Sequence, residues 1–130
     1  MDLTYSSEET MFKDSVDSYV RDYQRAASTT APCGFRREAL TEMADLGWLA
    51  ASFPEAVGGF GGSAIETMII HEGIGSGLIV EPVLTTVLAT RLLTVADPLR
   101  AAELVPSLLS GEVLGCVAHG EVPARGDVRF

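Results

Sequence analysis

Residues 46–82 read LGWLAASFPEAVGGFGGSAIETMIIHEGIGSGLIVEP, and three kinds of local structure follow one another along this run. A Leu-Gly-Trp turn at residues 46–48 comes first, and a loop with four glycines between residues 58 and 62 comes next. Ser63 and Glu66 then stand at the spacing of a capping box, in which each side chain bonds the other residue's backbone N–H. The run therefore predicts a turn and a tight loop that lead into an apolar helix.

Further helices are predicted on both sides of this run. Ser6 and Glu9 have the same capping-box spacing, and the apolar residues at 12, 16, 19, 20 and 23 fall on one helical face. Residues 26–34 interrupt that pattern. A second helix is expected over residues 35–46, with Gly47 just past its end and Trp48 covering that end. Glu81-Pro82 and Asp97-Pro98 each begin another helix, because proline suits the first helical turn.

The packing of these helices follows from their apolar periodicity. The stripes expected to face inward are Val83, Val87, Leu88, Leu92 and Val95 on one helix, and Leu99, Ala102, Val105 and Leu109 on the next. Pro106 is expected to bend or shorten the latter helix. The glycines at 73, 75 and 77 are expected to end the helix that starts at Ser63. Trp48, Phe53 and Phe60 are expected to be core anchors first and ligand contacts second.

Residues 113–118, VLGCVA, predict a short apolar strand that has no partner strand in the sequence. The predicted fold is an all-α, up-and-down bundle of about five helices with this short trailing β-strand. A length of 130 residues suits one domain with one sizeable core. An apolar strand without a partner indicates that further chain or an obligate partner supplies the pairing.

The charge balance excludes some classes of function. Nine basic residues face eighteen acidic ones, which gives a net charge of −9 and argues against nucleic acid as a partner. No basic segment followed by an apolar one is visible at the N-terminus, and no uninterrupted apolar run approaches the roughly 20 residues that span a bilayer. A cytoplasmic protein without a membrane partner is expected.

Two chemistries are not supported by residue spacing. Cys33 and Cys116 are far apart and lack a metal-binding pattern, and His71 and His119 have no ligand-spaced partners, so neither a disulfide nor a metal site is predicted. The glycine-rich loop lacks the Lys-Ser/Thr of a phosphate-binding loop and no strand plainly precedes it. A phosphate cradle is therefore disfavoured.

Taken together, these pieces resemble the N-terminal helical domain of the acyl-CoA dehydrogenases. The resemblance rests on Leu46-Gly47-Trp48, on Pro54-Glu55, on the glycine-rich loop and on Glu72-Gly73-Ile74-Gly75. A narrower resemblance, to the small subunit of the pimeloyl-CoA dehydrogenase type, rests on Val80-Glu81-Pro82 and Ala118-His119-Gly120-Glu121.

The resemblance implies a helical domain over residues 1–112 and the start of a middle β domain over residues 113–130, whose remainder the chain lacks. It also implies FAD as the cofactor of the complete enzyme. Residues 120–127, GEVPARGD, stand where the family has a Thr-Glu-Pro-Gly-Ala-Gly-Ser-Asp motif. Gly120 and Glu121 are the candidate cofactor contacts there, and Gly120 would act through its backbone. No residue of this chain matches the catalytic base.

The same resemblance places the acyl-binding region at the helix after Ser63, with Met68, Ile69, His71 and Glu72 as candidate substrate contacts. His71 would suit the distal carboxylate of a dicarboxylyl-CoA, because an ionised Glu72 would repel it. The alternative is an exposed His71, with Glu72 bonded to a helix terminus or a neighbouring chain.

Two classes of function stay open. The first is the N-terminal domain or small subunit of an FAD-dependent acyl-CoA dehydrogenase, which converts acyl-CoA to trans-2-enoyl-CoA and is inactive without its remaining domains or a large subunit. Its expected partners are an acyl-CoA substrate and a homo- or hetero-oligomer. The second is a non-catalytic helical subunit or interaction module that retains the fold.

Overall fold

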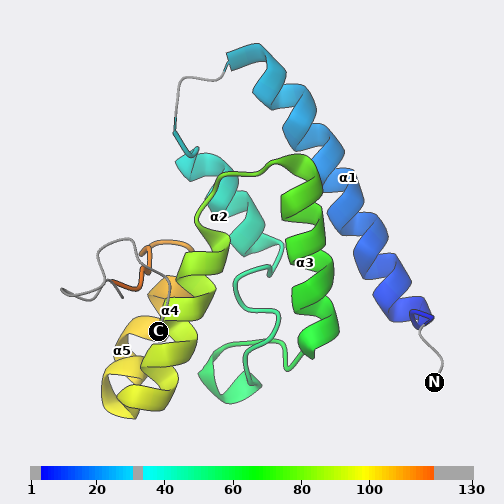
Figure 1. The fold of residues 1–130 in the computed structure, drawn as a ribbon. Helices are drawn as coiled ribbons and strands as arrows, with labels where there is room; N and C mark the ends of the chain where they lie inside the picture. Colours follow the sequence, from blue (N-terminus) through cyan, green and yellow to red (C-terminus); the bar gives the residue numbers. More distant parts are fainter. Residues whose placement is uncertain (1–3, 31–33, 119–130) are drawn as a thin grey trace, which may run out of the picture.

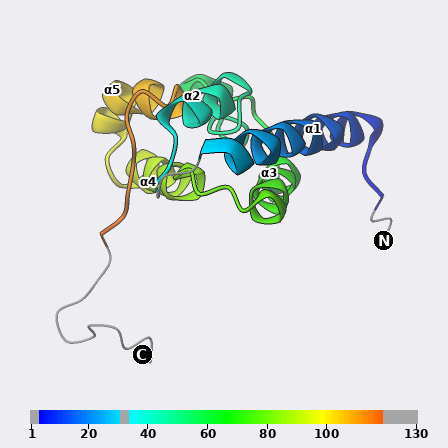
Figure 2. The same cartoon turned by 90° about the horizontal axis from the view of Figure 1, so that it is seen from above.

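Five α-helices make up the fold in the computed structural model, which describes residues 4–30 and 34–118, without the side chains of 27–30. The elements are α1 (Ser7–Thr30), α2 (Arg37–Asp45), a 3₁₀ turn η1 (Glu55–Val57), α3 (Ala64–Gly77), α4 (Val83–Ala96) and α5 (Pro98–Leu109). Helices α1 and α3 lie side by side, and α4 pairs with α5 (Figures 1 and 2). The predicted all-α bundle of about five helices is confirmed.

Both capping boxes are formed. At the start of α1, the Ser6 N–H donates to the Glu9 carboxylate at 2.6 Å and the Glu9 N–H donates to the Ser6 hydroxyl at 3.2 Å. At the start of α3, the Ser63 N–H donates to the Glu66 carboxylate at 2.6 Å. These bonds satisfy N–H groups that a helix start leaves without a partner. Helix α1 is longer than predicted, because it continues through residues 26–30.

The end of α2 confirms the predicted turn. Gly47 has a φ of 82°, which glycine adopts without steric cost. Its N–H donates to the Ala44 carbonyl at 2.8 Å, and the Trp48 N–H donates to the Met43 carbonyl at 3.0 Å. This bond pair is the Schellman arrangement, in which an apolar residue beyond the glycine covers the helix end. Trp48 is buried and belongs to the core.

Helix α3 ends at Gly77, the last of the three glycines predicted to end it, but it continues without a break through Gly73 and Gly75. A methyl group on Gly73 would lie 2.5 Å from a Val16 methyl carbon, and one on Gly77 would lie 2.8 Å from a Val20 methyl carbon. Glycines spaced by four residues therefore let α3 approach α1 closely. Leu78 caps the end of the helix and has a φ of 51°.

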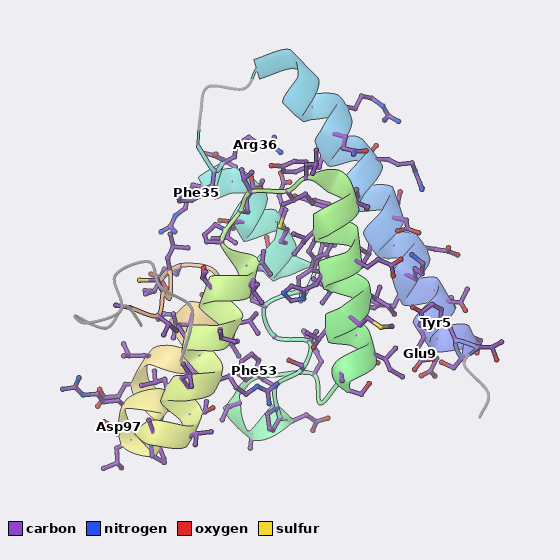
Figure 3. All side chains as sticks on the ribbon, viewed as in Figure 1. Tyr5, Glu9, Phe35, Arg36, Phe53 and Asp97 are labelled. Carbon is purple, nitrogen blue, oxygen red and sulfur yellow. The ribbon has the colours of Figure 1, made fainter. Side chains whose placement is uncertain are left out.

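Two apolar cores hold the helices. The larger joins α1, α2, α3 and the first turn of α4, and its fully buried side chains include Val16, Leu40, Met43, Ile69, Ile70 and Val83. The smaller lies between the loop after α2 and helix α5, and consists of Ala50, Phe53, Ala101, Val105 and Leu109. Phe53 points from the loop toward α4 in Figure 3. Trp48 and Phe53 are thus confirmed as core anchors.

The inward face predicted for α4 is wrong at three of its five positions. Val83 is buried and Val87 packs against the core, but Leu88 and Leu92 are 50% and 51% exposed and Val95 is more exposed still. The buried side chains opposite them include Thr86 and Thr90. The Thr90 hydroxyl donates to the Thr86 carbonyl at 2.7 Å. Because this bond satisfies the hydroxyl within the helix, threonines can occupy the buried face.

Helix α5 departs from its predicted stripe in a similar way. Leu99 and Ala102 are exposed, whereas Val105 and Leu109 are buried as predicted. The helix continues past Pro106 to Leu109.

The predicted strand at residues 113–118 is absent from the described residues. Residues 114–118 have no regular structure there, and the Gly115 N–H reaches the Thr86 hydroxyl at 3.4 Å in place of a neighbouring strand. A strand needs a partner for its backbone groups. The described part of the chain offers none.

Candidate functional site

The four predicted acyl contacts on α3 point in different directions. Ile69 is buried in the larger core, whereas Met68 is half-exposed. Glu72 is exposed on the side of Lys13. Hydrogen bonding to Asp17 is the largest cause of the raised pKa of Lys13, and the charge of Glu72 contributes less. These side chains do not gather around one cavity.

His71 is half-buried and lacks a partner for one ring nitrogen. Its Nδ1 lies 2.8 Å from the Thr67 carbonyl oxygen, which only accepts, so Nδ1 carries a hydrogen. Its Nε2 is sealed from solvent and has no hydrogen-bond partner among the described residues. A buried hydrogen-bond acceptor without a partner lowers the stability of the fold. A hydrogen-bond donor is therefore expected to bind this atom.

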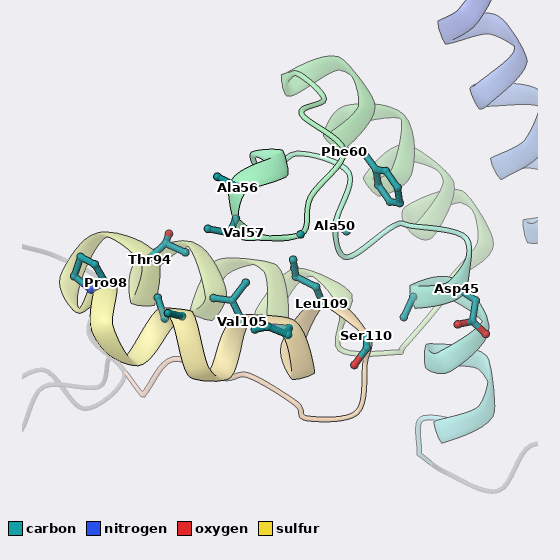
Figure 4. Close-up of a pocket in the computed structure, with 15 residues that line it drawn as sticks. Asp45, Ala50, Ala56, Val57, Phe60, Thr94, Pro98, Val105, Leu109 and Ser110 are labelled. Carbon is teal, nitrogen blue, oxygen red and sulfur yellow. The ribbon is translucent and has the colours of Figure 1, made fainter.

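A cavity lies elsewhere, between α5, η1 and the end of α2 (Figure 4). Its volume is about 780 Å³. Small apolar side chains form most of its wall, and they include Ala50, Ala56, Val57, Ala101, Ala102 and Val105. Asp45 is the sole charged residue among those that line it. Sequence reasoning missed this cavity, although the run of small residues along α5 was a signal for a hollow surface.

Phe60 borders both this cavity and a second one of about 360 Å³ beside α1 and α3. Phe60 was predicted as a core anchor, but it is 69% exposed. Its ring instead covers Gly47, where a methyl group would lie 2.6 Å from the ring edge. The absence of a side chain on Gly47 therefore leaves space for the Phe60 ring at the end of α2.

The glycine-rich loop does not form a phosphate cradle. The N–H groups of residues 58–62 all donate to backbone carbonyls within residues 50–55, at 2.8–3.2 Å. A phosphate-binding loop needs free N–H groups that point at the ligand. This loop therefore has no free N–H group with which to bind a phosphate. Gly120 and Glu121, the predicted cofactor contacts, lie outside the described residues.

Glu81 is the centre of a buried polar cluster. The Tyr23 hydroxyl donates to its carboxylate at 2.6 Å and the Arg36 backbone N–H donates at 3.2 Å. The Arg36 guanidinium lies 3.8 Å from the same carboxylate and 4.2 Å from the Tyr23 ring centre. Burial raises the pKa of Tyr23, and the bond to Glu81 adds to that rise. The cluster joins α1 to the segments before α2 and α4, where Figure 3 labels Arg36.

The outer face of α4 is apolar and uncovered. It consists of Leu84, Leu88, Leu92 and Val95. The only charged residue of α4, Arg91, folds its guanidinium onto the Ser52 carbonyl at 3.0 Å and over the Phe53 ring. Such a face on a helix is typical of a surface that another molecule or domain covers.

Other classes of site find no support in the described residues. Within residues 4–30 and 34–118, no group of three or more His, Cys, Asp or Glu side chains is placed to hold a metal ion. None of the helices described there is both long and apolar enough to span a membrane.

Comparison with known proteins places the fold. Residues 6–112 match the family model for the N-terminal domain of acyl-CoA dehydrogenase. A similar solved structure is the ChsE4-ChsE5 complex from Mycobacterium tuberculosis, with a TM-score of 0.68 and 22% sequence identity. The match covers 87% of this chain but 30% of that chain, so this chain spans under a third of its length. A comparison with curated proteins found no match.

Proposed function

The chain belongs to the acyl-CoA dehydrogenase family, and from this premise we propose that it supplies the N-terminal helical part of an FAD-dependent acyl-CoA dehydrogenase. In this proposal, residues 1–112 form the helical domain and residues 113–130 begin a middle β domain. The complete enzyme oxidises an acyl-CoA to its trans-2-enoyl-CoA, and the chain is inactive alone. FAD, when bound in the complete enzyme, would supply the acceptor for the hydride.

The observation that carries this proposal is the outer face of α4. Covering a leucine fully contributes about 1.5–3 kcal/mol, so an uncovered row of three leucines and a valine is a large unused source of association energy. The remaining dehydrogenase domains or a large subunit would cover it. The structural neighbour is itself a complex, which supports a hetero-oligomer as one form of this assembly.

The role of α3 in acyl binding is part of the same proposal. Met68 would present its half-exposed thioether to the acyl chain, and Ile69 would support that wall from the core. Glu72 would lie at its edge. His71, whose Nε2 has no hydrogen-bond partner among the described residues, is the proposed contact for the distal carboxylate of a dicarboxylyl-CoA.

Substrate preference tests the role of His71. His71→Ala in the assembled enzyme is expected to lower activity on dicarboxylyl-CoA substrates more than on monocarboxylyl-CoA substrates of equal length. Thr67→Ala, one turn earlier on α3, is the matched control, because it keeps the carbonyl that His71 contacts. Equal losses on both substrate classes would remove His71 from the site.

The first test of the whole proposal is the absorbance spectrum of the protein purified after expression together with its genomic neighbours. A flavin band in a complex whose intact mass includes this chain would support the dehydrogenase. In that complex, Gly120 and Glu121 are the proposed flavin contacts. A colourless, stably folded species of 13.8 kDa without a flavin-bearing partner would favour the alternative, a non-catalytic helical subunit or interaction module.

A further inference from the structure

Three aromatic side chains form a connected row in the larger core and at its edge. Tyr19 lies between Trp48 and Tyr23, with ring centres 5.2 Å from Trp48 in an edge-to-face contact and 6.5 Å from Tyr23. Trp48 is the only tryptophan of the chain, and it is buried. Both separations fall within the range of roughly 4.5–7 Å of interacting aromatic pairs, which brings the three rings close together.

Tyr19 also has a proton acceptor that reaches the surface. Its hydroxyl donates to the Glu42 carboxylate at 2.9 Å and lies 3.3 Å from the Ala39 carbonyl. Glu42 is exposed on α2. Burial raises the pKa of Tyr19, and the bond to Glu42 raises it further, so the phenol keeps its proton at neutral pH. An oxidised phenol loses this proton readily, and Glu42 is placed to take it.

We propose that Trp48, Tyr19 and Glu42 form a relay that carries an oxidising equivalent from the core to the surface. A one-electron oxidant, such as a reactive oxygen radical, removes an electron from the Trp48 indole. Tyr19 then gives an electron to the indole radical cation and its phenolic proton to Glu42. The products are intact Trp48, a Tyr19 phenoxyl radical and a protonated Glu42.

A soluble thiol completes the cycle at the surface. The thiolate gives one electron to the phenoxyl radical and becomes a thiyl radical, while Glu42 returns the proton to Tyr19. Every group of the protein is thereby restored. The relay protects Trp48, whose loss would expose the end of α2. It does not depend on the proposed dehydrogenase function, because the relay residues lie outside the proposed acyl and flavin contacts.

Packing alone explains the rings but not the whole arrangement. A phenylalanine at position 19 would fill the same space between Trp48 and Tyr23. The phenol adds a bond to an exposed carboxylate, which is not needed to fill the space between the rings. The relay gives this hydroxyl a function that packing does not require.

Pulse radiolysis with the azide radical, a one-electron oxidant that favours tryptophan, tests the relay. In the wild-type protein, the tryptophanyl absorption is expected to decay while a tyrosyl absorption rises at the same rate. Tyr19→Phe is expected to abolish that rise and to lengthen the tryptophanyl lifetime by roughly tenfold or more, as for a barrier higher by about 1.4 kcal/mol. Tyr5→Phe removes a phenol outside the row and is expected to change neither.

Glu42→Gln provides an independent test that keeps the tyrosine. Glutamine can accept the hydrogen bond but cannot hold the proton, so the transfer is expected to slow several-fold while circular dichroism stays unchanged. An unchanged tryptophanyl lifetime in folded Tyr19→Phe, or an unchanged transfer rate in Glu42→Gln, would overturn the relay. A tyrosyl signal that persists in Tyr19→Phe would overturn it as well.

Discussion

A single carboxylate, that of Glu81, joins three segments that are far apart in the sequence. Its side chain is fully buried, yet it accepts from the Tyr23 hydroxyl on α1 and from the Arg36 backbone before α2. Removing one partner of such a buried cluster leaves the other groups without hydrogen bonds. Glu81 is therefore more important for the stability of the fold than its position at a helix start suggests.

Replacing this carboxylate by an amide tests that role. Glu81→Gln is expected to lower the free energy of unfolding by about 1–3 kcal/mol, because a neutral amide cannot satisfy both donors and the guanidinium equally well. Urea denaturation followed by circular dichroism measures the change. Glu103→Gln, at an exposed position on α5, should stay within about 0.5 kcal/mol of the wild type. Equal stability of both variants would contradict the structural role of the cluster.

At single residues, the sequence predicted what depends on near neighbours in the chain. Ser63 with Glu66 and Gly47 with Trp48 are such cases, because the partners lie within five residues of one another. The bond between Tyr23 and Glu81 was not predictable, since 58 residues separate the partners. For the same reason, Phe60 was misplaced, as nothing local shows that its ring covers Gly47.

Among the elements, α3 shows how glycine can shape packing from inside a helix. Gly73 and Gly77 face the valines of α1, while Gly75 faces open space. One sequence cannot distinguish glycines that permit close approach from glycines that end a helix. For this reason the sequence did not show that only Gly77, and not Gly73 or Gly75, stands at the helix end.

The two kinds of glycine in α3 predict opposite effects of the same substitution. Gly73→Ala is expected to destabilise the fold by roughly 1–3 kcal/mol, because the new methyl overlaps Val16. Gly75→Ala, two residues on, is expected to stabilise it by about 0.5–1 kcal/mol, the usual gain in a helix interior. Thermal and urea unfolding of the two variants check the signs. A gain at both positions would mean that α1 and α3 are not in close contact.

The capping box of α3 predicts a dependence on pH. The bond from the Ser63 side chain, followed by backbone bonds, lowers the pKa of Glu66. A carboxyl group whose pKa is lower in the folded state stabilises the fold above its unfolded pKa, about 4.3. This contribution is lost as pH falls through the folded pKa. Glu66→Gln is expected to cost about 0.5–1 kcal/mol at pH 7, a small value because the group is partly exposed.

Urea midpoints of the wild type and Glu66→Gln from pH 7 to pH 3 measure this difference. The two curves should converge in acid, since both side chains are then neutral. Glu55→Gln, exposed on η1, should track the wild type at every pH. The wild type and Glu66→Gln could instead differ in urea midpoint as much at pH 3 as at pH 7. That result would show that the charge of Glu66 does not contribute to the capping box.

In helix α4, the periodicity of apolar residues did not predict which side chains are buried. Its residues are apolar on nearly all sides, so the leucine stripe did not specify which face turns inward. The structure turns Thr86 and Thr90 inward and the leucines outward. The candidate acyl contacts on α3 were equally underdetermined, because periodicity reports burial and not the position of a ligand.

For the whole molecule, the uncovered leucines of α4 support the proposal that another domain or subunit covers this helix. Helices α1 and α2 carry eight of the eighteen acidic residues, and α4 itself has none. An apolar face away from the acidic surface can be covered with little cost in charge desolvation. Association at α4 is therefore the property of the chain most open to test.

Leu88→Glu together with Leu92→Glu tests it, because both side chains are half-exposed and each anchor of such an interface is worth about 2 kcal/mol. The double variant is expected to keep its fold but to lose the flavin-bearing complex on co-purification, since each 1.4 kcal/mol weakens binding about tenfold.

Met11→Glu, at a 73% exposed position on α1, should assemble normally. Isolated wild type should also bind a hydrophobic dye more strongly than the double variant. If the double variant still co-purifies with its partner in full yield, the covering surface lies elsewhere on the bundle, and the cavity between α5 and η1 becomes the next place to place a charge.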